Sequence, residues 1–272
     1  MCSTCGCGGE DASTRVTLID GHTHDHDHPH DHPHEHPHQH PHEHGTRTVL
    51  LEQDILAKND LLAAGTRRHL TDHAITTINL MSSPGSGKTT LLERTITDLD
   101  GRRETLVIEG DQETWLDAQR IRSTGSKVVQ INTGAGCHLD AEMLDRGLAE
   151  LAPPDGSLVF VENVGNLVCP ALFDLGESAR VVIISVTEGA DKPAKYPYMF
   201  RTADLVLLNK IDLLPYVDFD VDLCLELIHR VKPDVELLPV SATRGDGLDA
   251  WHEWLANRSA ATALRSGYRP PG

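Results

Sequence analysis

Cysteine and histidine, which bind soft and borderline metal ions, are concentrated near the N-terminus of this sequence. Three thiols lie within six residues, and with one nitrogen ligand they would make a site for such an ion; a square-planar geometry would favour Ni2+. These thiols are Cys2, Cys5 and Cys7. A tract with histidine at every second position follows, which predicts many weak, exchangeable nickel sites. Its members are His22, His24, His26, His28, His30, His32, His34, His36, His38, His40, His42 and His44.

A second group of metal-ligating residue types lies in the segments G-C-H-L-D-A and N-L-V-C-P, which contribute Cys137, His138 and Cys169. Two thiolates and an imidazole suit Zn2+ or Ni2+, but three ligands leave a tetrahedral site open. An open position, or one filled by a second subunit, would let the metal leave. On spacing alone, a buried Cys137 beside a hydrogen-bonded His138 remains an alternative. Cys224 lies in a helical apolar pattern and is expected in the core.

The segment S-S-P-G-S-G-K-T-T, residues 82–90, lies between an apolar β-branched run and a helical pattern, which is the context of a phosphate-binding loop. Glycines let backbone N–H groups wrap a phosphate, Lys88 reaches the β- and γ-phosphates, and Thr89 offers a hydroxyl to Mg2+. The general pattern has glycine where this chain has Ser82. We expect the phosphates to be bound by Gly85, Ser86, Gly87, Lys88, Thr89 and Thr90.

The base that the nucleotide carries is indicated by N-K-I-D, residues 209–212. The Asp212 carboxylate can accept hydrogen bonds from N1–H and the exocyclic amine of guanine, a pair that adenine cannot donate. S-A-T, residues 241–243, resembles the loop that closes over guanine in GTPases. Together they favour GTP over ATP and predict base contacts from Asn209, Lys210, Asp212, Ser241 and Ala242.

Two acidic residues after apolar runs, Asp111 and Glu162, can hold Mg2+ directly or through water. Strand ends capped in solvent are the alternative. The N–H of Gly165 is placed to sense the γ-phosphate, and Asn166 stands where many fast GTPases carry glutamine, which predicts slow hydrolysis. The expected catalytic set is Lys88, Thr89, Asp111, Glu162 and Gly165, with Mg2+ held by Thr89, Asp111 and Glu162.

The elements that must position these residues follow from the apolar pattern. Short β-branched runs are separated by segments of helical composition, which predicts a three-layer, doubly wound α/β fold with a mostly parallel sheet. Ligands then bind at the C-terminal ends of the strands. The runs are Ile75–Met81, Glu104–Ile108, Lys127–Ile131, Leu158–Val161, Val181–Val186, Leu205–Leu208 and Val235–Val240.

The chain is expected to divide into four parts. Residues 1–46 are expected to form a disordered metal-binding tail, because their low-complexity composition cannot pack a core. Residues 47–72 are predicted as a lead-in helix, residues 73–260 as the GTPase domain and residues 261–272 as a C-terminal tail.

Charge and hydropathy limit the partners of this chain of 272 residues. Its net charge is −17, which argues against binding to nucleic acid or to an anionic membrane surface. No signal peptide or bilayer-spanning apolar stretch is found in the sequence, so a cytoplasmic location is expected. Thiols stay reduced there, so the six cysteines are expected as ligands or buried side chains rather than disulfides.

The ordered series of motifs resembles the hydrogenase nickel-incorporation GTPases, the HypB family, over residues 47–260. The series runs from the phosphate loop through I-E-G-D-Q, G-C-H-L-D-A, E-N-V-G-N-L-V-C-P and N-K-I-D. The two metal segments distinguish the family from the related urease accessory GTPases. The resemblance implies Ni2+ or Zn2+ at Cys137, His138 and Cys169. It implies a separate tight nickel site at Cys2, Cys5 and Cys7.

The resemblance also implies a homodimer promoted by GTP or metal, and two partners: a second metallochaperone of hydrogenase maturation and the hydrogenase large-subunit precursor. The favoured function is a GTP-hydrolysing metallochaperone that stores nickel and delivers it to that precursor. Two alternatives stay open. One is a nickel storage or buffer protein, and the other is delivery to another nickel enzyme such as urease.

Overall fold

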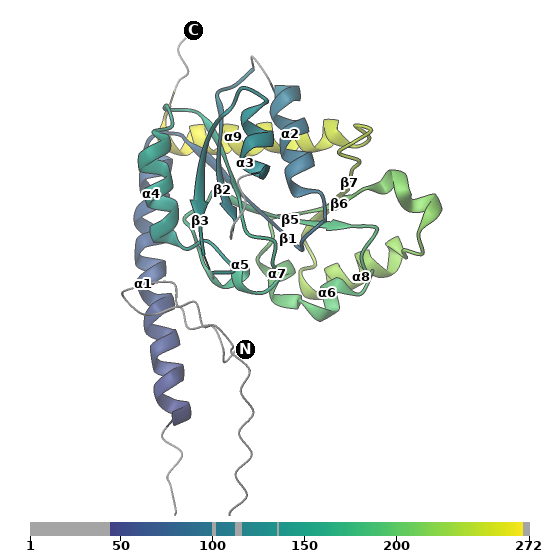
Figure 1. Ribbon diagram of the computed structural model, residues 1–272, viewed down its shortest axis with the longest axis horizontal. Helices are drawn as coiled ribbons and strands as arrows, with labels where there is room; N and C mark the ends of the chain where they lie inside the picture. The colour runs from purple at the N-terminus through teal and green to yellow at the C-terminus, as the bar shows by residue number, and fades with distance from the viewer. Residues whose placement is uncertain (1–43, 100–101, 112–115, 135, 269–272) are drawn as a thin grey trace, which may run out of the picture. The chain divides into compact units, whose positions relative to one another are not determined.

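The computed structural model describes residues 44–99, 102–111, 116–134 and 136–268 (Figure 1). The chain divides into two compact units, residues 1–52 and residues 53–272. The three N-terminal cysteines and the histidines up to residue 42 lie outside the described residues. Helix α1 (His44–Asp72) begins at the last histidine of the tract, three residues before the predicted start of the lead-in helix.

A parallel sheet forms the centre of the second unit. Within the described residues it has seven strands in the order β3-β2-β4-β1-β5-β6-β7, and every neighbouring pair is parallel. The predicted doubly wound α/β fold is confirmed, and each predicted run overlaps one strand. The strands are β1 (Thr76–Ser82), β2 (Thr105–Asp111), β3 (Lys127–Asn132), β4 (Leu158–Glu162), β5 (Ala179–Ser185), β6 (Leu205–Asn209) and β7 (Glu236–Pro239).

Helices cover both faces of the sheet, because parallel strands need crossover connections. Side chains alternate between the faces along each strand. On β5, Val181 and Ile183 join the core that contains Trp251 of α9, whereas Val182 and Ile184 join the core beneath α7 and α8. The helices are α2 (Lys88–Leu99), α3 (Leu116–Arg122), α4 (Ala141–Leu151), α5 (Cys169–Leu172), α6 (Lys192–Lys195), α7 (Pro197–Thr202), α8 (Val221–Val231) and α9 (Leu248–Ser266), with a 3-10 helix at Ile211–Tyr216.

The end of the chain differs from the expectation of a tail from residue 261. Helix α9 continues to Ser266, because Thr262 is still buried against the domain. Gly267 then adopts a left-handed conformation with φ of 70°, which glycine tolerates and which ends the helix. None of the helices in the described ranges is both long and apolar enough to cross a bilayer.

The parallel arrangement places the C-terminal ends of all strands at one edge of the sheet. β1 leads there into the phosphate-loop segment, while β4 ends at Glu162 and β6 ends at Asn209. Motifs that are far apart in the sequence are therefore brought to the same edge.

Candidate functional site

A cavity of about 570 Å3 opens at this edge of the sheet. Its wall combines the β1–α2 loop with the ends of β2 and β4 and with Lys210. The predicted site residues that line it are Gly85, Gly87, Lys88, Thr89, Thr90, Asp111, Glu162 and Gly165. Ser86, in the same loop, is buried. The cavity therefore holds the phosphate, Mg2+ and sensor candidates together.

The loop before α2 depends on glycine at residue 87. Gly87 has φ of 93°, and a Cβ atom there would lie 2.6 Å from Nδ2 of Asn209. Helix α2 starts at Lys88, so its free N–H groups and the positive end of its dipole face the cavity. Ser82, where the general motif has glycine, is the buried last residue of β1 and donates a hydrogen bond to the Ser83 carbonyl. An anionic phosphate group fits this loop.

Glu162 is held between the two side chains expected to bind Mg·GTP. Thr89 Oγ1 donates a hydrogen bond of 2.6 Å to Oε1 of Glu162, and Lys88 Nζ lies 3.6 Å from the same oxygen. Burial raises the pKa of the Glu162 carboxyl, while Lys88 and Thr89 lower it. The other oxygen, Oε2, is buried without a hydrogen-bond partner among the described residues. A hydroxyl beside an unpartnered carboxylate oxygen is a donor set that fits Mg2+.

A second buried carboxylate, which the sequence motifs did not indicate, lies in the same cavity. Glu109 on β2 pairs in register with Glu162 on β4, lines the cavity and is only 2% exposed. Burial, followed by the charge of Glu162, raises its pKa to about 8. The signal in the sequence was an acid inside an otherwise apolar strand, two residues before Asp111. Four carboxylates, those of Glu109, Asp111, Asp117 and Glu162, therefore line this cavity, rather than the two expected.

The guanine motifs lie directly behind the phosphate loop. Asn209 Nδ2 donates a hydrogen bond of 2.9 Å to the Ser86 carbonyl, and its Oδ1 accepts one of 3.2 Å from the Ala242 N–H. Ser241 Oγ donates a hydrogen bond of 2.6 Å to Asp212 Oδ1, which holds the carboxylate in place. Asn209 thus joins the phosphate loop to both predicted base segments.

Lys210 makes a further contact between the same segments. It has φ of 63°, and its Nζ donates a hydrogen bond of 2.6 Å to the Gly85 carbonyl. This left-handed backbone turns the chain directly after β6, so that the lysine side chain lies along the phosphate loop.

The second group of metal-ligating residues is assembled at the same edge. Each residue offers one ligand atom, and the three ligand atoms of Cys137, His138 and Cys169 all lie within 4.8 Å of one another. All three residues are half-buried. The His138 ring stacks on Phe173 with centroids 3.9 Å apart. Burial lowers the pKa of His138, although the negative charge of Asp140 acts in the opposite direction. The lowered pKa favours the neutral imidazole that coordinates metals. The structure thus favours a three-ligand set over the buried Cys137 alternative.

A short segment runs from the cavity to this set. Gly165 packs against the phosphate loop, since a Cβ atom there would lie 3.2 Å from Pro84 Cα. Asn166 Oδ1 accepts a hydrogen bond of 2.8 Å from the Val168 N–H, and α5 then begins at Cys169. This segment thus runs from the cavity lining at Gly165 to Cys169. Its backbone connects the two sites.

Cys224 takes no part in either site. It is fully buried on α8, and burial raises the pKa of its thiol to about 12. Its predicted place in the core is confirmed.

Comparison with known proteins agrees with this arrangement. The family model of the CobW/HypB/UreG nucleotide-binding domain matches residues 76–239. Hydrogenase maturation factor HypB of Rhizobium leguminosarum bv. viciae is 55% identical over 220 residues, which cover 81% of this chain and 74% of the relative. The same factor of Escherichia coli K12 is 51% identical over 215 residues, which cover 79% and 74%.

Solved structures give the same result. The crystal structure of HypB from Helicobacter pylori in complex with nickel is 36% identical, with a TM-score of 0.70, and the match covers 79% of this chain and 99% of that one. The Archaeoglobus fulgidus HypB structure is 38% identical, also with a TM-score of 0.70, and covers 75% and 99%. With its phosphate loop and its matches along most of both chains, this protein belongs to the HypB family of hydrogenase maturation factors.

Proposed function

We propose that this protein is a GTP-hydrolysing nickel metallochaperone, which stores nickel and delivers it to the hydrogenase large-subunit precursor. The observation that carries the proposal is the placement of two sites at one edge of the sheet. A phosphate-binding cavity and a thiol–imidazole set are joined by the segment from Glu162 to Cys169. Nucleotide and metal therefore bind on one continuous piece of backbone.

The nucleotide is held by groups that already point into the cavity. Lys88 leaves Glu162 for the β- and γ-phosphates, and Asp212, fixed by Ser241, accepts both hydrogen bonds from guanine. Mg2+ would neutralise negative charge on the phosphates when it is bound. Thr89, Asp111 and Glu162 are the residues that would hold it.

The hydrolysis step is expected to be slow. The Asn166 side chain stands where many fast GTPases carry glutamine, and its Oδ1 accepts a hydrogen bond from the Val168 N–H of its own loop. The N–H of Gly165, beside Pro84, is the candidate that detects the γ-phosphate. Slow turnover suits a protein whose nucleotide state acts as a signal.

Nickel is the cargo of the second site. Two thiolates and a neutral imidazole favour Ni2+ or Zn2+, and three ligands leave a position through which the metal can exchange. The nickel complex of the H. pylori relative supports Ni2+. The groups that take the nickel from this site would come from a second copy of the chain, from a second metallochaperone or from the precursor.

The N-terminal tail adds storage to this scheme. Cys2, Cys5 and Cys7 would form a tight nickel site, and the twelve histidines of the tract would hold further ions weakly. We propose that the protein works in the cytoplasm as a homodimer promoted by GTP or metal.

A second candidate function is delivery to urease. A relative from Helicobacter hepaticus, 38% identical over 218 residues, is named a hydrogenase/urease maturation factor. Deleting the gene and assaying both enzymes, with and without added nickel, tests the two functions. Loss of hydrogenase alone, restored by excess nickel, supports the first function, and loss of both enzymes supports the second. Loss of neither would leave storage alone.

A further inference from the structure

A buried polar network connects the nucleotide end of β4 with the loop that carries two of the metal ligands. Asn163 directly follows Glu162 and is 1% exposed. Its Oδ1 accepts hydrogen bonds from the N–H of Val164, at 3.0 Å, and from the N–H of Leu139, at 3.2 Å. Leu139 is the residue after His138, so one side-chain oxygen joins the two backbone segments.

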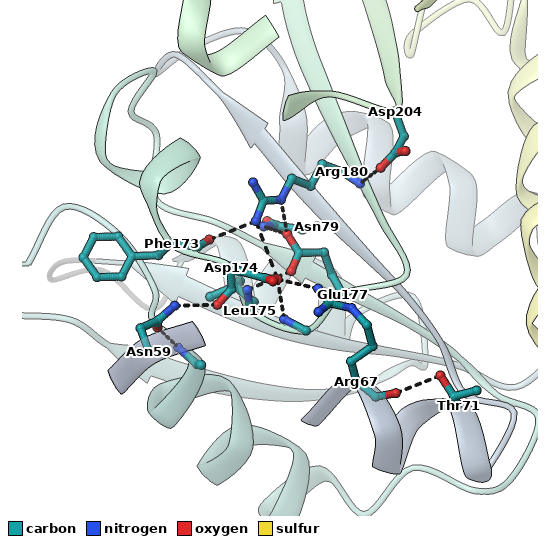
Figure 2. Close-up of polar contacts among 12 residues, drawn as sticks. Asn59, Arg67, Thr71, Asn79, Phe173, Asp174, Leu175, Glu177, Arg180 and Asp204 are labelled. Atoms are coloured by element: carbon teal, nitrogen blue, oxygen red, sulfur yellow. Dashed lines mark hydrogen bonds and ion pairs between the residues drawn. The ribbon is translucent and has the colours of Figure 1, made fainter. Parts of the chain in front are cut away.

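The network continues from Asn163 across the sheet. Asn163 Nδ2 donates a hydrogen bond of 3.3 Å to Oδ1 of Asn79 on β1, and Asn79 Nδ2 donates one of 3.2 Å to Oε1 of Glu177. The same Glu177 oxygen accepts a hydrogen bond of 2.5 Å from Nε of Arg180. Figure 2 shows Asn79, Glu177 and Arg180 grouped in this way.

Arg180 completes the connection to the third ligand. Its guanidinium donates a long hydrogen bond of 3.5 Å to the backbone carbonyl of Ala171. A second long bond, of 3.4 Å, goes to the carbonyl of Phe173 (Figure 2). Ala171 lies in α5, which begins at Cys169, and the Phe173 ring stacks on His138. Both segments that carry metal ligands are therefore hydrogen-bonded to one network that starts beside Glu162.

Burial makes this network sensitive to displacement. Asn79, Asn163 and Glu177 are 0%, 1% and 5% exposed. A buried polar group that loses its partner is not compensated by water, so these bonds are costly to break. If the end of β4 shifts when the nucleotide is exchanged, the network must respond in one of two ways. Either the metal-bearing segments at Leu139 and Phe173 move with it, or the hydrogen bonds of the network rearrange.

We propose that Asn163 is a positioning residue of the metal set, through which the nucleotide state alters the spacing between the Cys137–His138 pair and Cys169. The inference rests on the proposed function and specifies how its metal site is regulated. This route through side-chain hydrogen bonds is separate from the backbone route between Gly165 and Cys169.

The experiment compares nickel affinity in two nucleotide states. Full-length protein with Cys2→Ser, Cys5→Ser and Cys7→Ser is titrated with NiSO4, and thiolate-to-nickel charge-transfer absorption is followed. This signal reports the internal thiolates and excludes nickel held only by histidine. Titrations are run with Mg·GDP and with Mg and a non-hydrolysable GTP analogue. The variants are Asn163→Ala and Asn79→Leu.

Asn59→Leu is the matched control. Asn59 is also buried, and it contacts the same two metal-bearing segments through the Asp174 carbonyl at 2.8 Å and the Ala141 N–H at 2.9 Å. However, it ties them to α1 rather than to β4. It should therefore change nickel affinity by the same factor in both nucleotide states and leave their ratio unchanged.

We expect a ratio of nickel dissociation constants between the two states of about 5 to 150 in the parent protein, the range of measured allosteric couplings. In Asn163→Ala and Asn79→Leu the ratio should fall clearly below the parental value, toward one, while both ligands still bind. Folded variants that keep the parental ratio would overturn the inference, as would equal affinities in the parent. If the parent bound no nucleotide, or no nickel through these thiolates, the proposed function itself would fail.

Hydrogen exchange on the unmutated chain tests the inference even if both variants fail to fold. The Leu139 N–H is bonded to Asn163 Oδ1, so its protection should differ between the GDP and GTP-analogue states. Identical protection in the two states would contradict a role for Asn163.

Discussion

Replacing Asp212 by asparagine should destroy the preference for guanine. Ser241 Oγ donates a hydrogen bond to Asp212 Oδ1, which fixes the position of the carboxylate. Asparagine at this position keeps its amide oxygen toward Ser241 and presents NH2 in place of the second oxygen. Guanine then meets a donor where its own N–H groups need an acceptor.

The expected loss follows from the two hydrogen bonds to the charged group. Each such bond contributes about 1.5–3 kcal/mol. Losing both should therefore weaken GDP binding about 10²- to 10⁴-fold, since each 1.4 kcal/mol is tenfold. Xanthine carries a carbonyl in place of the exocyclic amine, so the variant should gain affinity for XDP.

Isothermal titration of GDP, XDP and ADP into parent and variant checks this prediction. Asp218→Asn is the matched control, because Asp218 is an exposed aspartate on the same segment and should leave all three affinities unchanged. An Asp212→Asn protein that keeps its GDP affinity and gains none for XDP would refute the assignment of the guanine site.

Three further predictions concern the metal set, a buried carboxylate and the core. Phe173→Ala removes the ring stacked on His138, so it should weaken nickel binding by about 2- to 10-fold in the charge-transfer titration, as expected for an aromatic pair. Glu109→Gln should stabilise the nucleotide-free protein by ~2–4 kcal/mol near pH 8, measured by urea unfolding. The folded pKa of Glu109 is raised, so its cost to stability grows from pH 4.5 to about pH 8 and vanishes below that window. Trp251→Phe loses the 2.9 Å hydrogen bond from the indole to Thr95 and should cost about 1–3 kcal/mol of unfolding free energy.

The sequence was sufficient for the fold and for the position of most candidate site residues. Buried parallel strands appear as short β-branched runs, and the ends of β1, β4 and β6 are followed by recognisable motifs. Because parallel strands end at one edge, the order of motifs already predicted that they meet there. Cys169 and the Cys137 segment are an example, since no local pattern links them and the sheet alone brings them together.

Side-chain partners across strands could not be predicted. Asn79 and Asn163 are 84 positions apart. In the sequence, Asn79 looks like an ordinary polar residue within one predicted run, and Asn163 like one that follows another. Glu109 was missed for the same reason, since its burial beside Glu162 depends on the register of β2 against β4. The length of α9 depends on the packing of Thr262, which the weak apolar pattern of that helix does not reveal.

The most direct test of the proposed function is nickel transfer from the loaded protein to the hydrogenase large-subunit precursor. Transfer would be measured with GTP and with a non-hydrolysable analogue, for the unmutated chain and for Lys88→Ala. We expect transfer only with GTP, at a rate no faster than GTP hydrolysis, and only from the chain that retains Lys88. Equal transfer under all four conditions would show that nickel delivery does not depend on the GTPase site.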